Sequence, residues 1–265
     1  MTKAKHGTLD LAGLAGELGS MYKEKATKAN FLVYGRKGAG KTHLAGTCPQ
    51  PVLIHSFDPG GTRITFLQKL WRAGKILIDS RYENEDIKKP TAFKTWLDEI
   101  NRLGEAGIWE KIGTYFLDSG TYWADSILTD MVARGGRPGD TPQLQDYGKQ
   151  QVVLRDCLSS LLALPCHFVM TGHIDQIRDE VSGKMHSSLL ATGKLKAKIP
   201  PLFDEFYVID SEQRGKELYR YLLTATDGKL EAGTRIGSAY FEQKEEPNIQ
   251  KLLKKAGYSW EHKLS

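Results

Sequence analysis

The segment "GRKGAGKT" (residues 35–42) follows the apolar run "FLVY" and constrains the fold more than any other part of the chain. It matches the pattern G-x-x-x-x-G-K-[ST] at every fixed position. Glycines let the backbone wrap closely around phosphate oxygens, and a helix that begins near Lys41 directs its positive end at the same anion. We expect Lys41 to neutralise the β- and γ-phosphates and Thr42 to offer a hydroxyl to Mg²⁺. The candidate phosphate loop comprises Gly35, Arg36, Lys37, Gly38, Ala39, Gly40, Lys41, Thr42 and His43.

Strand and helix patterns alternate along the chain after this loop, which predicts an α/β fold. We expect a mostly parallel sheet with helices on both faces and an antiparallel edge strand at 218–226. The other strands are predicted at 31–35, 51–57, 75–79, 112–119, 167–173 and 205–210, and helices at 62–74, 91–105, 141–164 and 246–258. The predicted divisions are a lead-in (1–28), an α/β core that contains the phosphate loop (29–240) and a C-terminal helix and tail (241–265).

Composition narrows the class of protein. The 265 residues carry a formal net charge of +5, which permits a polyanionic partner without requiring one. No apolar run approaches the roughly 18 residues of a membrane span, and the charged N-terminus lacks the apolar stretch of a signal peptide. The three cysteines have no metal-site spacing. These features favour a cytoplasmic protein with free thiols and no membrane partner.

A phosphate loop needs a carboxylate that holds Mg²⁺ directly or through water. "TYFLDS" provides Asp118 at the end of an apolar strand, followed by Ser119. The alternative role for Asp118 is to cap the next helix. Asp79 in "KILIDS" is a rival carboxylate, but its strand is shorter and earlier.

Hydrolysis also needs a group that orients the attacking water. "SFDPGG" puts Asp58 at the carboxyl end of the strand after the loop, where strand ends converge on a ligand. Asp58 is therefore a candidate general base, although Asp-Pro-Gly-Gly is also a good turn sequence. "VMTGH" ends another buried strand with His173, which is either a γ-phosphate sensor or a structural residue.

The segment "GKLKAKIP" carries Lys194, Lys196 and Lys198 at alternate positions. If the segment is extended, the three lysines share one face. They then either follow DNA phosphates, reach a nucleotide on a neighbouring subunit, or form a solvated charged strand. The first part of the segment 175–206, with Ser182-Gly183-Lys184, is expected to be a hairpin or mobile loop.

The order of motifs resembles a known family. "GRKGAGKT", "SFDPGG", "YFLDS", "DYGKQQ", "MTGH", "TGKLKAKIPPLFDEFYVI" and "AGTR" succeed one another between residues 29 and 237. In this order they are similar to the RecA-like phage nucleotide-binding proteins, which include the single-strand annealing ATPases of the fourth Sak class. The run from "DYGKQQ" through "FDEF" carries the most specific part of the resemblance.

The resemblance implies a RecA-like P-loop core, ATP with Mg²⁺, single-stranded DNA as partner, and a role in phage recombination or replication. It assigns the second Walker position to Asp118 and the sensor position to His173. Asp58 stands where such proteins usually carry glutamate, so its carboxylate is one methylene shorter. Arg235 is kept, although a lysine often found before Thr-Arg is absent. We expect a ring or filament in which Arg235 or the lysines complete the neighbour's nucleotide site.

Two other functions remain open. A nucleotide-gated helicase loader or replication accessory protein with little turnover would fit the shorter carboxylate of Asp58. A P-loop small-molecule kinase would also use the phosphate loop, but the sequence has no Arg-x-x-x-x-Arg lid.

Overall fold

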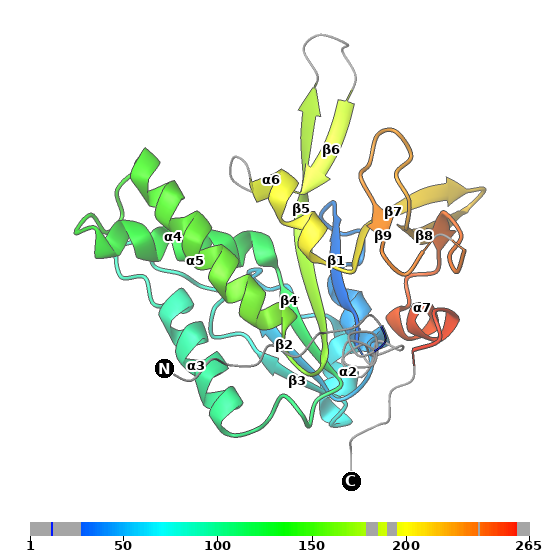
Figure 1. Ribbon diagram of the computed structural model, residues 1–265, viewed down its shortest axis with the longest axis horizontal. Helices are drawn as coiled ribbons and strands as arrows, with labels where there is room; N and C mark the ends of the chain where they lie inside the picture. Colours follow the sequence, from blue (N-terminus) through cyan, green and yellow to red (C-terminus); the bar gives the residue numbers. More distant parts are fainter. Residues whose placement is uncertain (1–11, 13–27, 179–184, 190–194, 238, 259–265) are drawn as a thin grey trace.

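The computed structural model describes residues 12, 28–178, 185–189, 195–237 and 239–258. The strands of the described part are β1 (Asn30–Gly35), β2 (Val52–Ser56), β3 (Ile76–Asp79), β4 (Thr114–Asp118), β5 (His167–Arg178), β6 (Met185–Leu189), β7 (Glu205–Arg214), β8 (Glu217–Leu223), β9 (Gly233–Thr234) and β10 (Lys244–Glu245). They form one sheet in the order β10-β8-β7-β1-β5-β4-β2-β3, with β6 paired to β5 and β9 to β7 (Figure 1).

The six strands from β7 to β3 are parallel, so their carboxyl ends lie along the same side of the sheet. β1 lies between β5 and β7, and its last residue, Gly35, is in register with His173. β8 and β10 extend the sheet in antiparallel fashion beyond β7. The predicted α/β fold with a mostly parallel sheet and antiparallel edge strands is confirmed.

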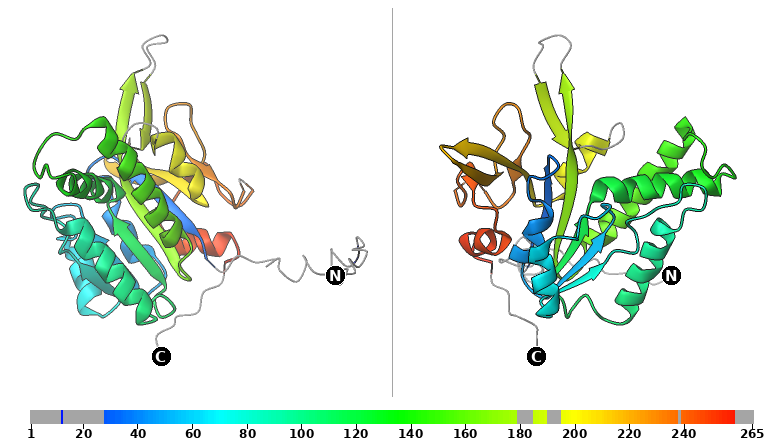
Figure 2. Two further views of the ribbon diagram at one scale, coloured as in Figure 1. Left: turned by 60° about the vertical axis from the view of Figure 1, so that its left-hand side comes forward. Right: turned by 180° about the vertical axis from the view of Figure 1, so that it is seen from behind.

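Helices cover both faces of the sheet, as expected. They are η1 (Thr42–Thr47), α2 (Thr65–Arg72), α3 (Ala92–Glu105), α4 (Gly120–Arg134), α5 (Leu144–Leu162), α6 (Leu195–Lys198), η2 (Pro200–Leu202) and α7 (Ile249–Lys255). α3, α4 and α5 lie on one face, and η1, α2 and α7 on the other (Figure 2).

Alternate strand residues supply the two cores, because side chains along a strand point to opposite faces. In β1, Leu32 and Tyr34 pack with Trp96 of α3 and Trp123 of α4. Phe31 and Val33, the residues between them, contribute to the other core, which includes Leu44, Leu67 and Leu252 from η1, α2 and α7. Each strand near the phosphate loop is therefore buried on both faces, which holds its carboxyl end in place.

Some helix boundaries differ from those that the sequence predicts. The helix after the phosphate loop is the short 3₁₀ helix η1, which ends before Cys48. α5 begins three residues after the expected Thr141 cap, because Gln143 and Asp146 form a capping box instead. The helix runs through Gly148.

The "DYGKQQ" motif has a packing role. Asp146 accepts hydrogen bonds from Gln143 N and from Arg137 Nη2, both at 2.7 Å. The buried Gln150 donates through Nε2 to Ala124 O at 2.7 Å. These contacts join the start of α5 to α4 and to the segment that connects the two helices.

The lysine segment is not a strand. Residues 195–198 form α6, so the one-face arrangement expected of an extended chain does not apply to Lys196 and Lys198. Lys198 is exposed, and Lys194 lies outside the described residues. The hairpin expected before this segment is confirmed by the antiparallel pairing of β5 with β6, which projects from the rest of the molecule (Figure 1).

α7 packs against the element that follows the phosphate loop. Its first residue, Ile249, donates through N to Thr47 Oγ1 at 3.1 Å, and Gln250 Nε2 donates to Cys48 O at 2.8 Å. In the part of the chain that the structure describes, no helix is long and apolar enough to cross a membrane.

Candidate nucleotide site

The phosphate loop connects β1 to η1 at the carboxyl edge of the sheet. A Cβ atom at Gly35 would lie 2.4 Å from Ile209 O of β7, so the close approach of β7 requires glycine there. Gly38 and Gly40 have φ angles of 81° and 109°, which L side chains rarely adopt. The glycines that the motif demands are therefore explained by the neighbouring strand and by the shape of the loop.

Lys41 lies beneath the loop with 6% of its surface exposed. Its Nζ donates to Gly35 O at 2.9 Å and to Arg36 O at 3.0 Å. Burial lowers the pKa of the Lys41 ammonium, while the charges of Asp118 and Asp58 oppose that shift. The loop thus places a desolvated cation where a phosphate chain would be wrapped.

Asp118 ends β4 and is fully buried. Its Oδ2 accepts a hydrogen bond from Thr42 Oγ1 at 2.6 Å, and its Oδ1 accepts one from Thr171 Oγ1. Burial raises the pKa of the Asp118 carboxyl, and the two hydroxyl donors and the nearby Lys41 counter this effect. Oxygen ligands of this kind suit Mg²⁺, which commonly keeps several waters and binds one or two protein oxygens together with substrate phosphates.

The donor set therefore fits Mg²⁺ held jointly by protein, water and nucleotide. Thr42 and Asp118 are the residues that would hold it. Among the described residues, no group of three or more His, Cys, Asp or Glu side chains could hold a metal ion by itself.

Asp58 and His173 face each other beside this pair. His173 Nε2 lies 3.6 Å from Asp58 Oδ2, which is too long for a hydrogen bond. Asp58 N and Phe57 N both donate to Asp118 O, so the Asp58 turn is attached to the end of β4. Both side chains are partly open to solvent, with 25% of Asp58 and 18% of His173 exposed.

The strand ends bring five of the predicted residues together. Lys41 and Thr42 follow β1, Asp58 follows β2, Asp118 ends β4, and His173 lies in β5 beside Gly35. The rival Asp79 is not at this site, since its carboxylate accepts hydrogen bonds from Arg81 Nη2 and Tyr82 Oη at 2.6 Å.

Two clefts flank the phosphate loop. One has a volume of about 450 Å³ and is lined by Gly35, Arg36, Lys37, His173 and Ile174. The other, of about 320 Å³, has Gly38, Gly40, His43, Phe66 and Arg220 among its lining residues. In it, the rings of His43 and Phe66 are stacked at 5.9 Å, which offers an aromatic surface next to the loop.

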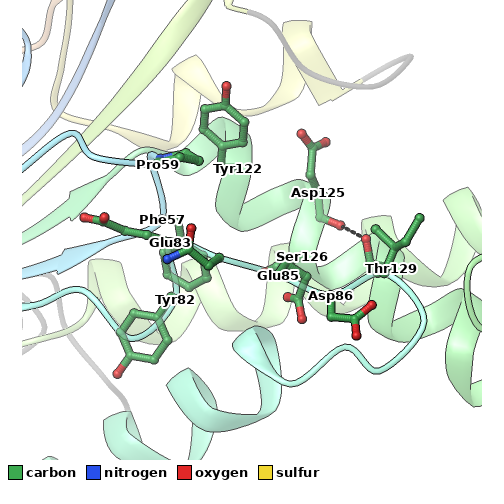
Figure 3. A pocket seen from close by; sticks show the side chains of 12 residues that line it. Phe57, Pro59, Tyr82, Glu83, Glu85, Asp86, Tyr122, Asp125, Ser126 and Thr129 are labelled. Carbon is green, nitrogen blue, oxygen red and sulfur yellow. Dashed lines mark hydrogen bonds between the residues drawn. The ribbon is translucent and has the colours of Figure 1, made fainter.

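A larger cleft of about 500 Å³ lies between the segment after β3 and α4 (Figure 3). The lining residues described there include four carboxylates and no lysine or arginine, which disfavours phosphate. The acidic side chains are those of Glu83, Glu85, Asp86 and Asp125.

Arg235 lies near the amino-terminal end of β1, whereas the phosphate loop follows the carboxyl-terminal end of that strand. Its Nη1 is 3.7 Å from Asp204 Oδ1, and its Nη2 donates to Pro201 O. Asp204 in turn accepts a hydrogen bond from Asn30 N, at the first residue of β1. Because Gly35 is the last residue of β1, Arg235 is about 17 Å from the loop along that strand.

Sequence reasoning did not assign two of the side chains in contact with this site. Thr171 could have been found, because it ends the same buried run as His173. Glu83, which supports the Asp58 turn, had no such signal, because it lies 25 residues further along the chain. Its contacts exist only after β2 and β3 pair.

The strand order and the residues around the phosphate loop define a RecA-like P-loop ATPase. A family model described as AAA domain (AAA_24) matches residues 27–236, and the chain belongs to that family. No curated protein matches the chain.

Three solved structures illustrate the similarity. A KaiC-like protein from the hyperthermophilic archaeon Pyrococcus horikoshii OT3 is 18% identical, with a TM-score of 0.41 over 74% of this chain and 77% of that one. A type III secretion system ATPase of pathogenic bacteria is 12% identical, with a TM-score of 0.47 over 69% and 52%. The flagellar accessory protein FlaH from Methanocaldococcus jannaschii is 10% identical, with a TM-score of 0.41 over 82% and 83%.

Proposed function

We propose that this ATPase uses Mg-ATP to control its binding to single-stranded DNA, in phage-type recombination, single-strand annealing or replication. The observation that carries the proposal is the path of β5. At the nucleotide site, Thr171 of this strand donates to Asp118, and His173 faces Asp58. The same strand then continues into the β5–β6 hairpin, which projects from the molecule (Figure 1). A change at the γ-phosphate would reach the hairpin along one continuous strand.

The residues of the site divide the work of hydrolysis. Lys41 exchanges its two backbone carbonyl partners for phosphate oxygens. Bound Mg²⁺ would neutralise charge on the β- and γ-phosphates. Asp58 accepts the proton of the attacking water. His173, whose Nε2 lies 3.6 Å from the Asp58 carboxylate, senses whether the γ-phosphate is present.

Single-stranded DNA is the partner that the sequence resemblance implies and that the charge of the chain permits. The hairpin is followed by the segment with Lys194, Lys196 and Lys198, and the whole chain carries a net charge of +5. Lysines bind phosphates as point charges, so binding should depend on salt and be largely independent of sequence. A cytoplasmic location, in the host cell for a phage-encoded chain, is part of the proposal.

The assembly we propose is a ring or filament with ATP at the subunit boundaries. Arg235 lies too far along β1 from its own phosphate loop to act there. It is 59% exposed, which makes it accessible to a neighbouring copy. The lysines after the hairpin are the second source of cations for the neighbouring site.

The test is ATP turnover with and without single-stranded DNA, compared with Lys41→Ala. Wild-type protein should release phosphate faster with DNA, and Lys41→Ala should lose tight ATP binding, because the loop loses its buried cation. Sizing with a non-hydrolysable analogue should show larger complexes. Micromolar ATP affinity in Lys41→Ala would contradict the assignment of the loop.

DNA binding is tested separately by a salt series. Replacing Lys194, Lys196 and Lys198 by alanine should flatten the salt dependence, since each lost phosphate contact lowers the slope by roughly 0.7. An unchanged slope would place the DNA elsewhere. Nucleotide binding with little turnover and capture of a helicase would favour the loader role. Transfer of phosphate to a small acceptor would favour a kinase.

A further inference from the structure

The turn that carries Asp58 is attached at its start to the end of β4, where Phe57 N and Asp58 N donate to Asp118 O. It includes two glycines, and Gly60 has a φ angle of 72°. Its hydrogen bond from Gly61 N to Asp58 O, at 2.8 Å, closes the turn but does not attach it to the fold. On the outer side, the exposed Pro59 lines the cleft of about 500 Å³ (Figure 3). The backbone bonds to Asp118 O hold the start of the turn, and the residues that follow Asp58 need a further attachment.

One carboxylate joins three points along the turn. Glu83 Oε1 accepts hydrogen bonds from Ser56 Oγ at 2.8 Å and from Thr62 Oγ1 at 3.0 Å. Its Oε2 accepts one from Gly60 N at 3.0 Å. Ser56 precedes Asp58 by two residues, and the other two donors follow it. The contacts of Glu83 therefore bracket Asp58 on both sides in the sequence.

Glu83 is itself held firmly. Only 5% of its surface is exposed, and Ser56 is fully buried. The preceding residue, Tyr82, is 2% exposed, and its ring is stacked on Phe57, with centroids 5.0 Å apart. The segment after β3 thus contacts residues on both sides of Asp58. Tyr82 stacks on Phe57, and the Glu83 carboxylate accepts the three hydrogen bonds given above.

Glu83 lines the acidic cleft, but its carboxylate is directed toward the Asp58 turn. Figure 3 shows its carboxylate directed away from the side chains of Glu85, Asp86 and Asp125. Both of its oxygens already accept hydrogen bonds from the Asp58 turn. A carboxylate with this set of partners is suited to holding a backbone turn.

We propose that Glu83 is the positioning residue for Asp58. It fixes the turn against β2 so that the Asp58 carboxylate stays beside His173 and the end of β4. This inference rests on the proposed role of Asp58 in hydrolysis. Glu83 acts through Asp58 and does not touch the nucleotide.

The experiment compares two substitutions of Glu83. Glu83→Ala removes all three hydrogen bonds and should lower kcat on the order of 10²-fold, because a displacement of about 1 Å is enough for such a loss. KM for ATP and the affinity for a non-hydrolysable analogue should not change, since the phosphate loop is intact. Glu83→Gln should restore most of the turnover. Its amide oxygen can accept from Gly60 N, and its NH₂ group can donate to the two hydroxyls.

Matched variants separate positioning from general destabilisation. Glu85 lies two residues after Glu83 in the sequence. Glu85→Ala removes a carboxylate that accepts hydrogen bonds from Thr91 N and Ala92 N at the start of α3. It should leave kcat unchanged even if it lowers stability. Thr62→Val keeps the shape of the side chain and removes the hydroxyl that donates to Glu83 Oε1. It therefore tests the positioning role of Glu83 if Glu83→Ala does not fold. It should lower kcat by a smaller factor, again without a change in KM.

The outcomes for the Glu83 variants and for Lys41→Ala can be told apart. Wild-type kcat in Glu83→Ala, or in Thr62→Val if the alanine variant does not fold, would overturn the positioning role. A loss in Glu83→Gln as large as in Glu83→Ala would overturn it in favour of a proton-transfer role. Equal phosphate release from wild type and Lys41→Ala would contradict the ATPase site itself. Hydrogen exchange at the Gly60 amide measures the hydrogen bond from Gly60 N to Glu83 Oε2 without an activity assay. Protection should be lost in Glu83→Ala, and its retention there would also overturn the proposal.

Discussion

Two buried histidines should make the protein sensitive to mild acid. His55 and His167 are 1% and 3% exposed, and burial lowers the pKa of each from 6.5 to about 4. As the pH falls below about 6.5, the unfolded chain takes up a proton on each ring while the native rings stay neutral. The unfolded state therefore binds more protons over this window. The contribution of each ring to stability is fully present above the unfolded pKa and is lost as the pH falls toward 4.

The size of the effect follows from these pKa values. Between about pH 7.5 and about pH 5, each ring should remove about 2 kcal/mol from the free energy of unfolding. Two rings together remove about 4 kcal/mol, a large part of the 5–15 kcal/mol typical of a folded domain. Because carboxylates also titrate in this range, one histidine must be isolated by substitution.

His167→Asn isolates one ring. His167 Nδ1 accepts a hydrogen bond from Ala29 N at 3.1 Å, and the amide oxygen of asparagine can take over that role without titrating. Urea unfolding followed by tryptophan fluorescence at both pH values gives the free energies. The fixed cost of the substitution cancels in the difference between them. Wild type should lose about 2 kcal/mol more than His167→Asn on acidification. Equal losses would refute the link between burial and the pKa of His167.

Three further predictions concern the nucleotide site. Asp58→Asn should keep ATP binding and lose about 10²–10⁴-fold in phosphate release, because an amide cannot accept the proton; near wild-type turnover would place the base elsewhere. Asp118→Asn should abolish Mg²⁺-dependent turnover. Burial raises the pKa of the Asp118 carboxyl, so the ionised form is costly in the nucleotide-free protein. Asp118→Asn should therefore raise its Tm, by about 2–4 °C for each kcal/mol gained in the free energy of unfolding. A lower Tm in thermal unfolding would contradict this. Arg235→Ala mixed with Lys41→Ala should recover ATPase activity, since each supplies what the other lacks at a shared boundary. Absence of recovery in demonstrably mixed oligomers would mean that Arg235 does not act in trans.

The sequence was sufficient for the features that depend on local pattern. The phosphate loop is a contiguous motif, and its glycines are required by its own backbone and by the neighbouring β7. Buried apolar runs predict strands, and parallel strands bring their carboxyl ends to one edge, so the sequence predicts that Asp118 and His173 lie beside the phosphate loop, where the structure places them. This rule places side chains from distant parts of the chain together without any knowledge of packing.

Only the tertiary structure decided the features that depend on contacts between segments. The helical form of residues 195–198 overrides the alternation of lysines, which by itself fits an exposed strand equally well. Glu83 acquires its role because pairing of β2 with β3 carries the segment after β3 to the Asp58 turn. Arg235 is separated from its own phosphate loop by the length of β1. Periodicity and motif spacing describe neighbours along the chain. The partners of a buried carboxylate or an exposed guanidinium depend on how the strands pair, because strand pairing brings together residues that are far apart in the sequence.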